Sequence, residues 1–191
     1  MKKEKITGVI LAGGKNSRMG SDKGLLEVGG KKIIVHIIEE LKQVADEIII
    51  ISNGTHYDFL GYKVYCDIFE DCGPIGGIHA ALTSSKTEKN LIVSCDMPFI
   101  SKNIFKKIIG NSKGFEVIIP EWGNGMIEPL CAIYSRSCAD AFEKMIRKGE
   151  YKLRDSFKLF NVKKINFTKN KLSGNEFLNL NTPEEYQKIV K

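Results

Sequence analysis

Residues 9–26 read VILAGGKNSRMGSDKGLL and change character halfway, from apolar to glycine-rich and basic. The apolar part belongs to a predicted buried strand over 6–11, and the loop over 13–24 follows it. Glycines allow backbone N–H groups to approach and wrap an anion, and neighbouring cations neutralise its charge. A strand that opens into such a loop is typical of a phosphate-binding turn. The stretch therefore predicts a site for a nucleoside triphosphate.

Three basic side chains of this loop are candidates for binding the phosphates. The guanidinium of Arg18 offers a planar fork to phosphate oxygens and Lys23 offers a mobile point charge, so we assign both to the triphosphate. Lys15 is an auxiliary candidate, and Asp22 is interpreted as a turn residue that orients Lys23. The loop has neither the Walker A spacing nor that of a dinucleotide fingerprint, and a solvated turn is the alternative interpretation.

The rest of the chain alternates short apolar runs with segments of helical periodicity. The pattern predicts strands over 6–11, 47–52, 63–66, 90–95, 115–120, 130–134 and 177–180, and helices over 32–44, 76–84, 101–109, 137–147 and 182–190. The last helix should begin with a capping box, because Thr182 precedes Pro183 and Glu185 follows three residues later. Such alternation predicts an α/β fold of three layers, with a mostly parallel sheet and helices on both faces. The length suits one domain, 1–191.

Polar residues follow several predicted strands, and in such sheets ligands bind outside the carboxyl ends of the strands. Asp96 follows the strand over 90–95, where a carboxylate can hold Mg²⁺ between phosphate groups; an aspartate that caps the next turn is the alternative. Asp67 ends a shorter strand and could bind a base, a ribose or the metal. Asn53 follows the strand over 47–52 and is expected at the same edge.

Two further segments could receive a ligand. Gly73 and Pro74 stand directly before a predicted helix, whose free N–H groups can bind an anion or a purine edge; a tight turn is the alternative. Asn179 and Asn181 flank Leu180, so in a strand their side chains would share one face and could bind a polar ligand. A turn with an Asx cap is the other interpretation of this pair.

Composition excludes several classes of protein. No apolar run reaches the roughly 18 residues of a spanning helix, and the lysine-preceded apolar run near the N-terminus is too short for a signal peptide, so a cytoplasmic protein without membrane contact is expected. Five cysteines without a CxxC pair predict neither disulfides nor structural zinc. The net charge of +6 comes mainly from the C-terminal region. This excess of basic residues is interpreted either as a solvated surface or as a rim that attracts an anionic substrate. Nucleic-acid binding is not expected, because the basic stretches lack interleaved aromatics.

Four motifs in chain order carry a family resemblance. LAGGKNSRMGSDKGLL (11–26), DCGPIGGI (71–78), SCDMPFI (94–100) and LNTPEE (180–185) span nearly the whole chain. The first motif resembles the signature loop of nucleotidyltransferases with a Rossmann-like fold. Together the four resemble the MobA-type molybdenum cofactor guanylyltransferases. The segment 121–134 is similar to the sheet edge of that family with its Pro-Leu pair, but no catalytic residue is taken from it.

The resemblance also implies roles for individual residues. The backbone at the start of the signature loop would bind the guanine nucleotide, and two asparagines near the C-terminus would lie on the pterin side. Asp96 would bind GTP and Mg²⁺. The implied nucleotide-binding residues are Leu11, Ala12, Gly13, Gly14, Lys23, Asn53, Asp67 and Asp96, the implied pterin-side residues are Asn179 and Asn181, and the residues expected to carry catalysis are Arg18, Lys23 and Asp96.

The implied reaction is guanylyl transfer to an anionic acceptor. The terminal phosphate of molybdenum-bearing molybdopterin would attack the α-phosphorus of GTP, and pyrophosphate would leave. Because the nucleophile is already an anion, positioning and charge neutralisation would suffice. Transient contacts with cofactor-biosynthesis proteins or acceptor molybdoenzymes are expected. The alternatives are cytidylyl transfer to the same cofactor, guanylyl transfer to a cobamide precursor, and a non-catalytic nucleotide-binding regulator on the same fold.

Overall fold

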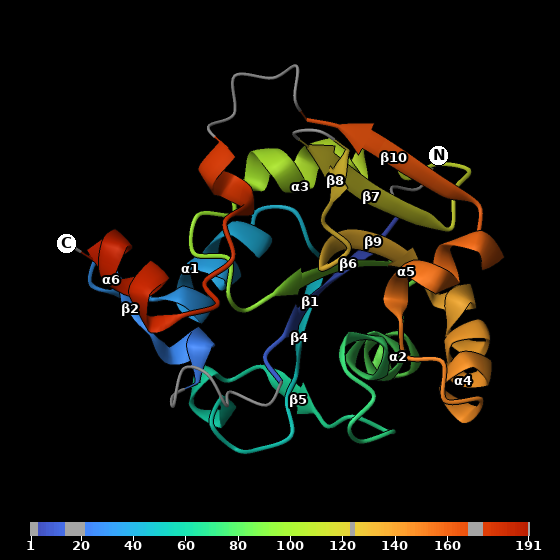
Figure 1. The fold of residues 1–191 in the computed structure, drawn as a ribbon, viewed down its shortest axis with the longest axis horizontal. Coiled ribbons are helices and arrows are strands. Elements are labelled where there is room, and N and C mark those ends of the chain that lie inside the picture. The colour runs from blue at the N-terminus through green and yellow to red at the C-terminus, as the bar shows by residue number, and fades with distance from the viewer. Residues whose placement is uncertain (1–3, 14–21, 123–124, 168–173, 191) are drawn as a thin grey trace.

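The computed structural model describes residues 4–13, 22–122, 125–167 and 174–190. Within them, a large sheet has the strand order β10-β7-β9-β6-β1-β4-β5, with β8 beside β7 (Figure 1). A separate hairpin pairs β2 (Glu27–Val28) with β3 (Lys31–Lys32). The strands of the large sheet are β1 (Ile6–Leu11), β4 (Glu47–Ile51), β5 (Lys63–Tyr65), β6 (Lys89–Ser94), β7 (Val117–Trp122), β8 (Met126–Ile127), β9 (Cys131–Ser135) and β10 (Val162–Asn166).

The large sheet is mixed but mostly parallel, as predicted. β1 runs parallel to β4 and β6, β4 to β5, and β7 to β10. β9 lies antiparallel between β6 and β7, and β8 is antiparallel to β7. Strands β1 and β4 are almost unbroken apolar runs because helices cover both faces of the sheet.

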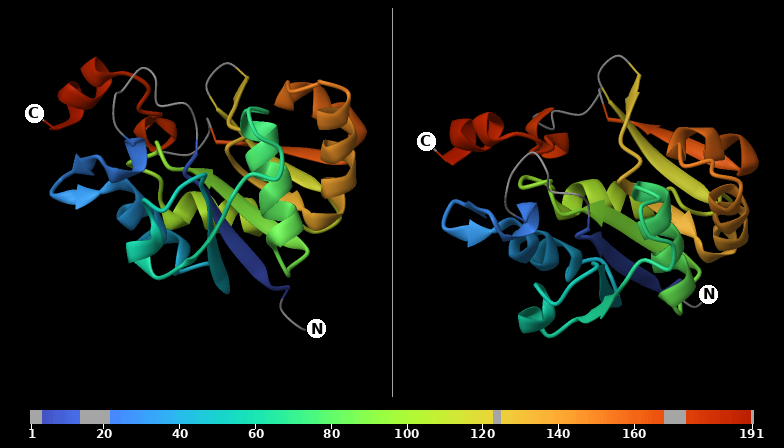
Figure 2. Two further views of the ribbon diagram at one scale, coloured as in Figure 1. Left: turned by 90° about the horizontal axis from the view of Figure 1, so that it is seen from below. Right: turned by 60° about the horizontal axis from the view of Figure 1, so that its bottom comes forward.

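Helices cover each face of the sheet and give the predicted three layers. α1 and α3 pack with Ile10 on one face, whereas α2 and α4 pack with Val9 and Leu11 on the other, as the two-residue period of a strand requires (Figure 2). The helices are α1 (Ile33–Leu41), α2 (Pro74–Ser84), α3 (Lys102–Ile109), α4 (Ala139–Arg147), the short α5 (Leu153–Ser156) and α6 (Pro183–Val190). None of the helices in the described ranges is long and apolar enough to cross a membrane.

Two helix starts show how local sequence sets the boundaries. α2 begins at Pro74, two residues earlier than expected, because proline suits the first helical position and Gly73 before it adopts a positive φ of 62°. The capping box of α6 is confirmed. The Thr182 hydroxyl accepts from the Glu185 N–H (3.2 Å), and the Glu185 carboxylate accepts from the Thr182 N–H (3.1 Å).

The strand predicted over 177–180 is wrong. A 3₁₀ turn, Gly174–Phe177, precedes three residues without regular structure. Phe177 and Leu180 are buried in the core, so their apolar character reports burial and not an extended backbone. The edge strand β10 was not predicted, because it reads VKKIN and shows only a weak apolar pattern.

Candidate active site

Three segments that lie far apart in the chain meet at the carboxyl ends of β1 and β6. The Lys23 ammonium lies 3.2 Å from Asp96 Oδ2 and donates to Asn181 Oδ1 at 3.0 Å. Backbone hydrogen bonds fix this junction: the Cys95 N–H donates to the Leu11 carbonyl (3.0 Å) and the Leu180 N–H to the Asp96 carbonyl (2.9 Å). The fold therefore brings together Lys23 and Asp96, which the sequence analysis assigned to the same triphosphate site.

One of the two carboxylate oxygens of Asp96 makes no hydrogen bond to the described residues. Oδ2 pairs with Lys23, but Oδ1 is buried and has no hydrogen-bond partner among the described residues. Both side chains are mostly shielded, with 16% of Asp96 and 20% of Lys23 exposed, so their charges are screened less than on an open surface. A buried, unpaired carboxylate oxygen is a costly feature in a folded protein and is a natural ligand for a hard divalent cation.

Asp22 holds the turn that carries Lys23. Its Oδ1 accepts from the Gly24 N–H (3.1 Å) and caps the 3₁₀ turn Lys23–Leu25. The hydroxyl of Tyr57, which is fully buried, donates to the same oxygen. A Cβ on Gly24 would lie 2.6 Å from the Tyr57 hydroxyl oxygen, so only glycine fits there. The interpretation of Asp22 as an orienting residue agrees with these contacts, whereas Tyr57 was missed because it lies 35 residues further along the chain.

Removing the Tyr57 hydroxyl should loosen this turn. In Tyr57→Phe, Asp22 keeps its charge but loses a buried donor, and a hydrogen bond to a charged group contributes about 1.5–3 kcal/mol. We expect the free energy of unfolding in urea to fall by about that amount. The control is Tyr62→Phe, which removes the hydroxyl of a half-buried tyrosine. Equal losses in the two variants would contradict a special role for the Tyr57–Asp22 contact.

A second polar pair lines a pocket beside the junction. Asn53 Nδ2 donates to Asp67 Oδ2 (3.0 Å), and the Asp67 N–H donates to Asn53 Oδ1 (2.8 Å). Burial raises the pKa of Asp67, and the hydrogen bond from Asn53 opposes this. The pocket has a volume of about 520 Å³. It is also lined by Leu11, Gly13, Ile51, Asp71, Gly73, Pro74, Gly77, Ser94 and Leu130. It therefore runs from the end of β1 to the N-terminus of α2.

The two C-terminal asparagines do not share a face, because their segment is not a strand. Asn181 contacts Lys23, whereas Asn179 Nδ2 donates to Glu128 Oε2 (2.9 Å). Glu128 is a buried acid between β8 and β9 that the sequence analysis did not select. Burial raises its pKa, while hydrogen bonds from Asn179 and from the Leu130 N–H lower it. The signal that could have found Glu128 is one acid inside the largely apolar stretch MIEPLCAIY.

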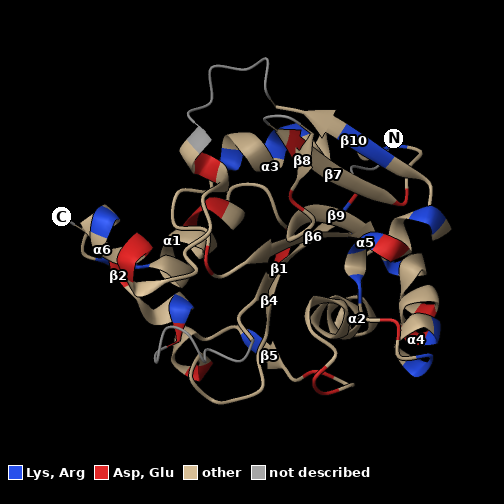
Figure 3. Ribbon diagram, in the orientation of Figure 1, with Lys and Arg blue, Asp and Glu red and all other residues tan. Residues whose placement is uncertain are grey.

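Some of the predicted site residues cannot be placed. Gly14, Lys15 and Arg18 lie outside the described residues, so their roles stay predictions. Ala12 can be placed: its N–H donates to the Ile51 carbonyl (2.9 Å), which joins the ends of β1 and β4. Those basic residues of the C-terminal region that the structure describes are distributed over α5, the turn after it, β10 and α6 (Figure 3).

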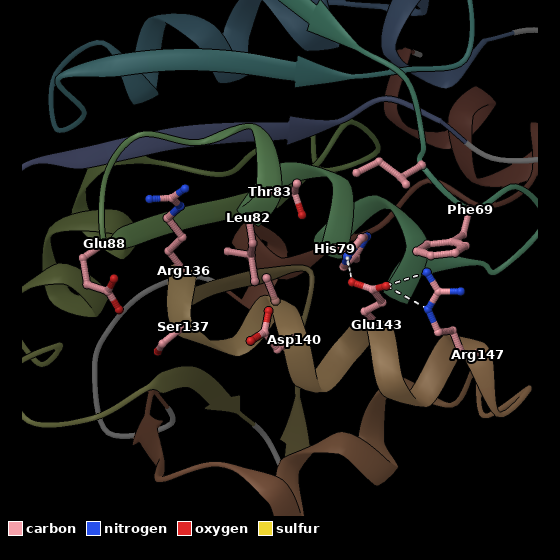
Figure 4. Close-up of a pocket in the computed structure, with 12 residues that line it drawn as sticks. Phe69, His79, Leu82, Thr83, Glu88, Arg136, Ser137, Asp140, Glu143 and Arg147 are labelled. Atoms are coloured by element: carbon pink, nitrogen blue, oxygen red, sulfur yellow. Dashed lines mark hydrogen bonds and ion pairs between the residues drawn. The ribbon is translucent and has the colours of Figure 1, made fainter.

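Another cavity, of about 590 Å³, lies between α2 and α4, and Figure 4 shows its lining. The Arg147 guanidinium binds Glu143 Oε1 through Nη2 (2.7 Å) and Nε (2.8 Å), and it lies 5.3 Å from the centre of the Phe69 ring. His79 Nε2 lies 3.9 Å from Glu143. None of the residues that meet at the Lys23–Asp96 junction lines this cavity, so it is separate from the candidate active site.

His79 should make the stability of the protein depend on pH. Burial lowers its pKa below the usual 6.5; Glu143 and Asp140 oppose this shift and Arg147 adds to it. Below pH 6.5 the unfolded chain therefore binds a proton that the folded chain does not, so the free energy of unfolding falls as the pH decreases. Urea midpoints measured between about pH 7.5 and 5.5 should fall less steeply in His79→Gln than in the wild type. His56→Gln, which removes a largely exposed imidazole, is the control, and equal slopes in the wild type and His79→Gln would contradict the prediction.

Fold and site together define a class of protein: an α/β nucleotide-binding domain with a cation–carboxylate pair at the carboxyl ends of its strands. Residues 8–164 match the family described as the MobA-like NTP transferase domain, and the chain belongs to that family. A probable molybdenum cofactor guanylyltransferase of Carboxydothermus hydrogenoformans is 38% identical over 98% of this chain and 96% of its own length.

A solved structure and a second relative agree with this assignment. The molybdopterin-guanine dinucleotide biosynthesis protein A of Archaeoglobus fulgidus superposes with a TM-score of 0.81, at 25% identity over 96% of each chain. The molybdenum cofactor guanylyltransferase of Desulfosudis oleivorans is 34% identical over 96% of this chain and 93% of its own length. The resemblance stated from the motifs is therefore confirmed, and so are the fold class and the enzyme class.

Proposed function

We propose that the protein transfers GMP from GTP to the terminal phosphate of molybdenum-bearing molybdopterin, which yields the guanine dinucleotide form of the cofactor and pyrophosphate. The observation that carries the proposal is the junction of Lys23 and Asp96 beside the 520 Å³ pocket. A polyphosphate needs a cation and a metal-binding carboxylate within reach of each other. The names of the curated relatives support the choice of substrates. The whole chain, 1–191, would act as one cytoplasmic domain.

The nucleotide would occupy the pocket between β1 and α2. Its volume lies within the roughly 300–1,000 Å³ usual for small-molecule sites. The backbone of Leu11, Ala12 and Gly13, continuing to Gly14, would hold the guanine nucleotide. Asn53 and Asp67 fix each other through two hydrogen bonds, so they would offer preorganised polar groups to the base or the ribose.

A divalent cation fits the residues present, and we propose Mg²⁺. Asp96 Oδ1 is a buried, unpaired, hard oxygen ligand among the residues that the structure describes. When bound, the ion would neutralise negative charge on the phosphates. Asp96 would hold it, and the Lys23 ammonium would balance the remaining charge of the triphosphate and of the leaving pyrophosphate.

The protein side of the reaction is positioning. An oxygen of the acceptor phosphate attacks the α-phosphorus in line, the α–β bridging oxygen leaves with pyrophosphate, and no proton must be removed from the nucleophile. Lys23, fixed by Asp96 and Asn181, would keep the triphosphate aligned. Arg18 would add a second cation from the signature loop. Asn179 and Asn181 would face the pterin substrate.

The decisive experiment supplies the protein with molybdopterin, Mg²⁺ and one nucleoside triphosphate at a time, and measures pyrophosphate release. Pyrophosphate release with GTP, and with none of the other triphosphates, supports the proposal. Release with CTP, and with none of the other triphosphates, identifies a cytidylyltransferase. The assay is repeated with a cobamide precursor in place of molybdopterin, and turnover only with that precursor identifies a cobamide guanylyltransferase. Binding of GTP without turnover on either acceptor identifies a regulator on the same fold.

A further inference from the structure

We propose that Glu128 is a positioning residue, which fixes the side-chain amide of Asn179 so that its carbonyl oxygen is offered to the second substrate. This inference rests on the proposed function, because the group that Asn179 would meet belongs to the acceptor molecule. It adds a residue from the β8–β9 connection to a site that otherwise uses the segments after β1, β4, β5 and β6 and the C-terminal segment before α6.

The backbone brings Glu128 and Asn179 to the same strand end. The Ser94 N–H donates to the Leu130 carbonyl (2.8 Å), which ties the segment before β9 to the end of β6. The Leu180 N–H donates to the Asp96 carbonyl (2.9 Å), which ties the C-terminal segment to the same place. Main-chain contacts therefore hold Glu128 next to the junction.

Both carboxylate oxygens of Glu128 are engaged. Oε1 accepts from the Leu130 N–H (3.2 Å), and Oε2 accepts from Asn179 Nδ2 (2.9 Å). Two charged groups act on it electrostatically: Asp96 raises the pKa of Glu128 and Arg154 lowers it. A carboxylate can only accept hydrogen bonds, so it selects the orientation in which the amide nitrogen of Asn179 faces Glu128.

The chosen orientation leaves the other end of the amide unsatisfied. Asn179 Oδ1 is buried and has no hydrogen-bond partner among the described residues, although Asn179 as a whole is half-buried. A buried oxygen without a partner is unfavourable, so a hydrogen-bond donor supplied by a ligand would contribute favourably to the free energy of binding. Phosphate oxygens carry no such donor at neutral pH. A pterin ring does, through its ring amide N–H and its amino group, so Asn179 would select for the ring end of the acceptor.

The substitution Glu128→Gln tests this without creating a cavity. The Leu130 N–H still requires an acceptor, so the carbonyl of the introduced glutamine should remain there and its NH₂ should face Asn179. The Asn179 amide would then turn and present NH₂, not oxygen, to the acceptor. We expect the affinity for molybdopterin, measured by direct titration, to fall about tenfold or more, with the KM for GTP unchanged.

A reversed pair should restore the site. In the double variant Glu128→Gln/Asn179→Asp, the NH₂ of the introduced glutamine donates to the introduced aspartate, whose second oxygen is again an acceptor for the ligand. The net charge equals that of the wild type. We expect molybdopterin affinity within a few fold of the wild type, whereas Asn179→Asp alone places two carboxylates against each other and should bind poorly.

Glu116→Gln is the matched control. Glu116 also accepts a main-chain N–H, from Asn161 (2.9 Å), but this contact does not involve the junction. Its molybdopterin affinity should equal that of the wild type. Unchanged affinity in Glu128→Gln, an equal rise of the KM for GTP, or a double variant no better than its worse single variant would overturn the inference.

Unfolding in urea separates this inference from the proposed function. The four proteins of the cycle need no substrate for that measurement, and a coupling free energy between positions 128 and 179 is expected. A wild type that binds no molybdopterin but shows the coupling would refute the proposed function and the substrate part of the inference, while the contact between the two side chains would stand. Absence of coupling would refute the positioning role even if guanylyl transfer is observed.

Discussion

Asp96→Asn is expected to lower pyrophosphate release from GTP and molybdopterin by about 10²–10³-fold or more, the scale of losing one preorganised electrostatic group at a reacting centre. Asparagine has nearly the same shape, so the segment that carries Leu180 on the Asp96 backbone should persist. The substitution removes the negative charge that balances Lys23, and with the amide oxygen facing Lys23 it puts an NH₂ group in place of the free oxygen proposed to hold the divalent cation. Steady-state pyrophosphate release over a range of Mg²⁺ concentrations is the measurement.

The control for this variant is Asp58→Asn, which removes an exposed acid from the turn Asp58–Leu60. Its activity should match that of the wild type. Urea unfolding should show that Asp96→Asn remains folded. An Asp96→Asn enzyme with full activity would contradict both the metal role and the assignment of the site.

Lys23→Met is expected to cause the second large loss, again about 10²–10³-fold in kcat/KM for GTP. Methionine retains the aliphatic length of lysine but cannot neutralise phosphate, and it leaves Asp96 Oδ2 without its ion pair. Lys23→Arg should recover only part of the activity, because a planar guanidinium does not reproduce a compact ammonium that meets both Asp96 and Asn181.

Lys31→Met is the control for Lys23→Met. Lys31 forms an exposed ion pair with Glu39 (2.6 Å), and exposed pairs contribute little to stability. Its kinetic constants should equal those of the wild type. If both lysine variants lose activity equally, the effect would come from net charge and not from the position of Lys23.

The sequence predicted the parts of the site that depend on strand order. The proximity of Lys23 and Asp96 was predictable, because both residues follow buried apolar strands whose carboxyl ends meet at one edge of a parallel sheet. The same reasoning placed Asn53 and Asp67 at one edge, where they form a pair. These inferences needed only the two-residue and helical periodicities of the chain.

The remaining parts depend on side-chain contacts that periodicity does not encode. Tyr57 meets Asp22, and Glu128 meets Asn179, across 35 and 51 residues of sequence. No local pattern marks either contact in advance. The segment 177–180 was assigned to a strand because apolar residues signal burial whether or not the backbone is extended.

The direction of β9 has a consequence for how this family could change its acceptor. The neighbouring strands β6 and β7 end at the edge of the sheet where Lys23 and Asp96 meet, whereas β9 begins there. Cys131 at the start of β9 lies opposite Val93 near the end of β6. The incoming connection carries Glu128, which accepts from Asn179, and Leu130, which lines the pocket proposed for the nucleotide. If Glu128 acts as proposed, changes at the Glu128 end of that connection would alter the acceptor side of the site, whereas changes at Leu130 would also alter the nucleotide pocket.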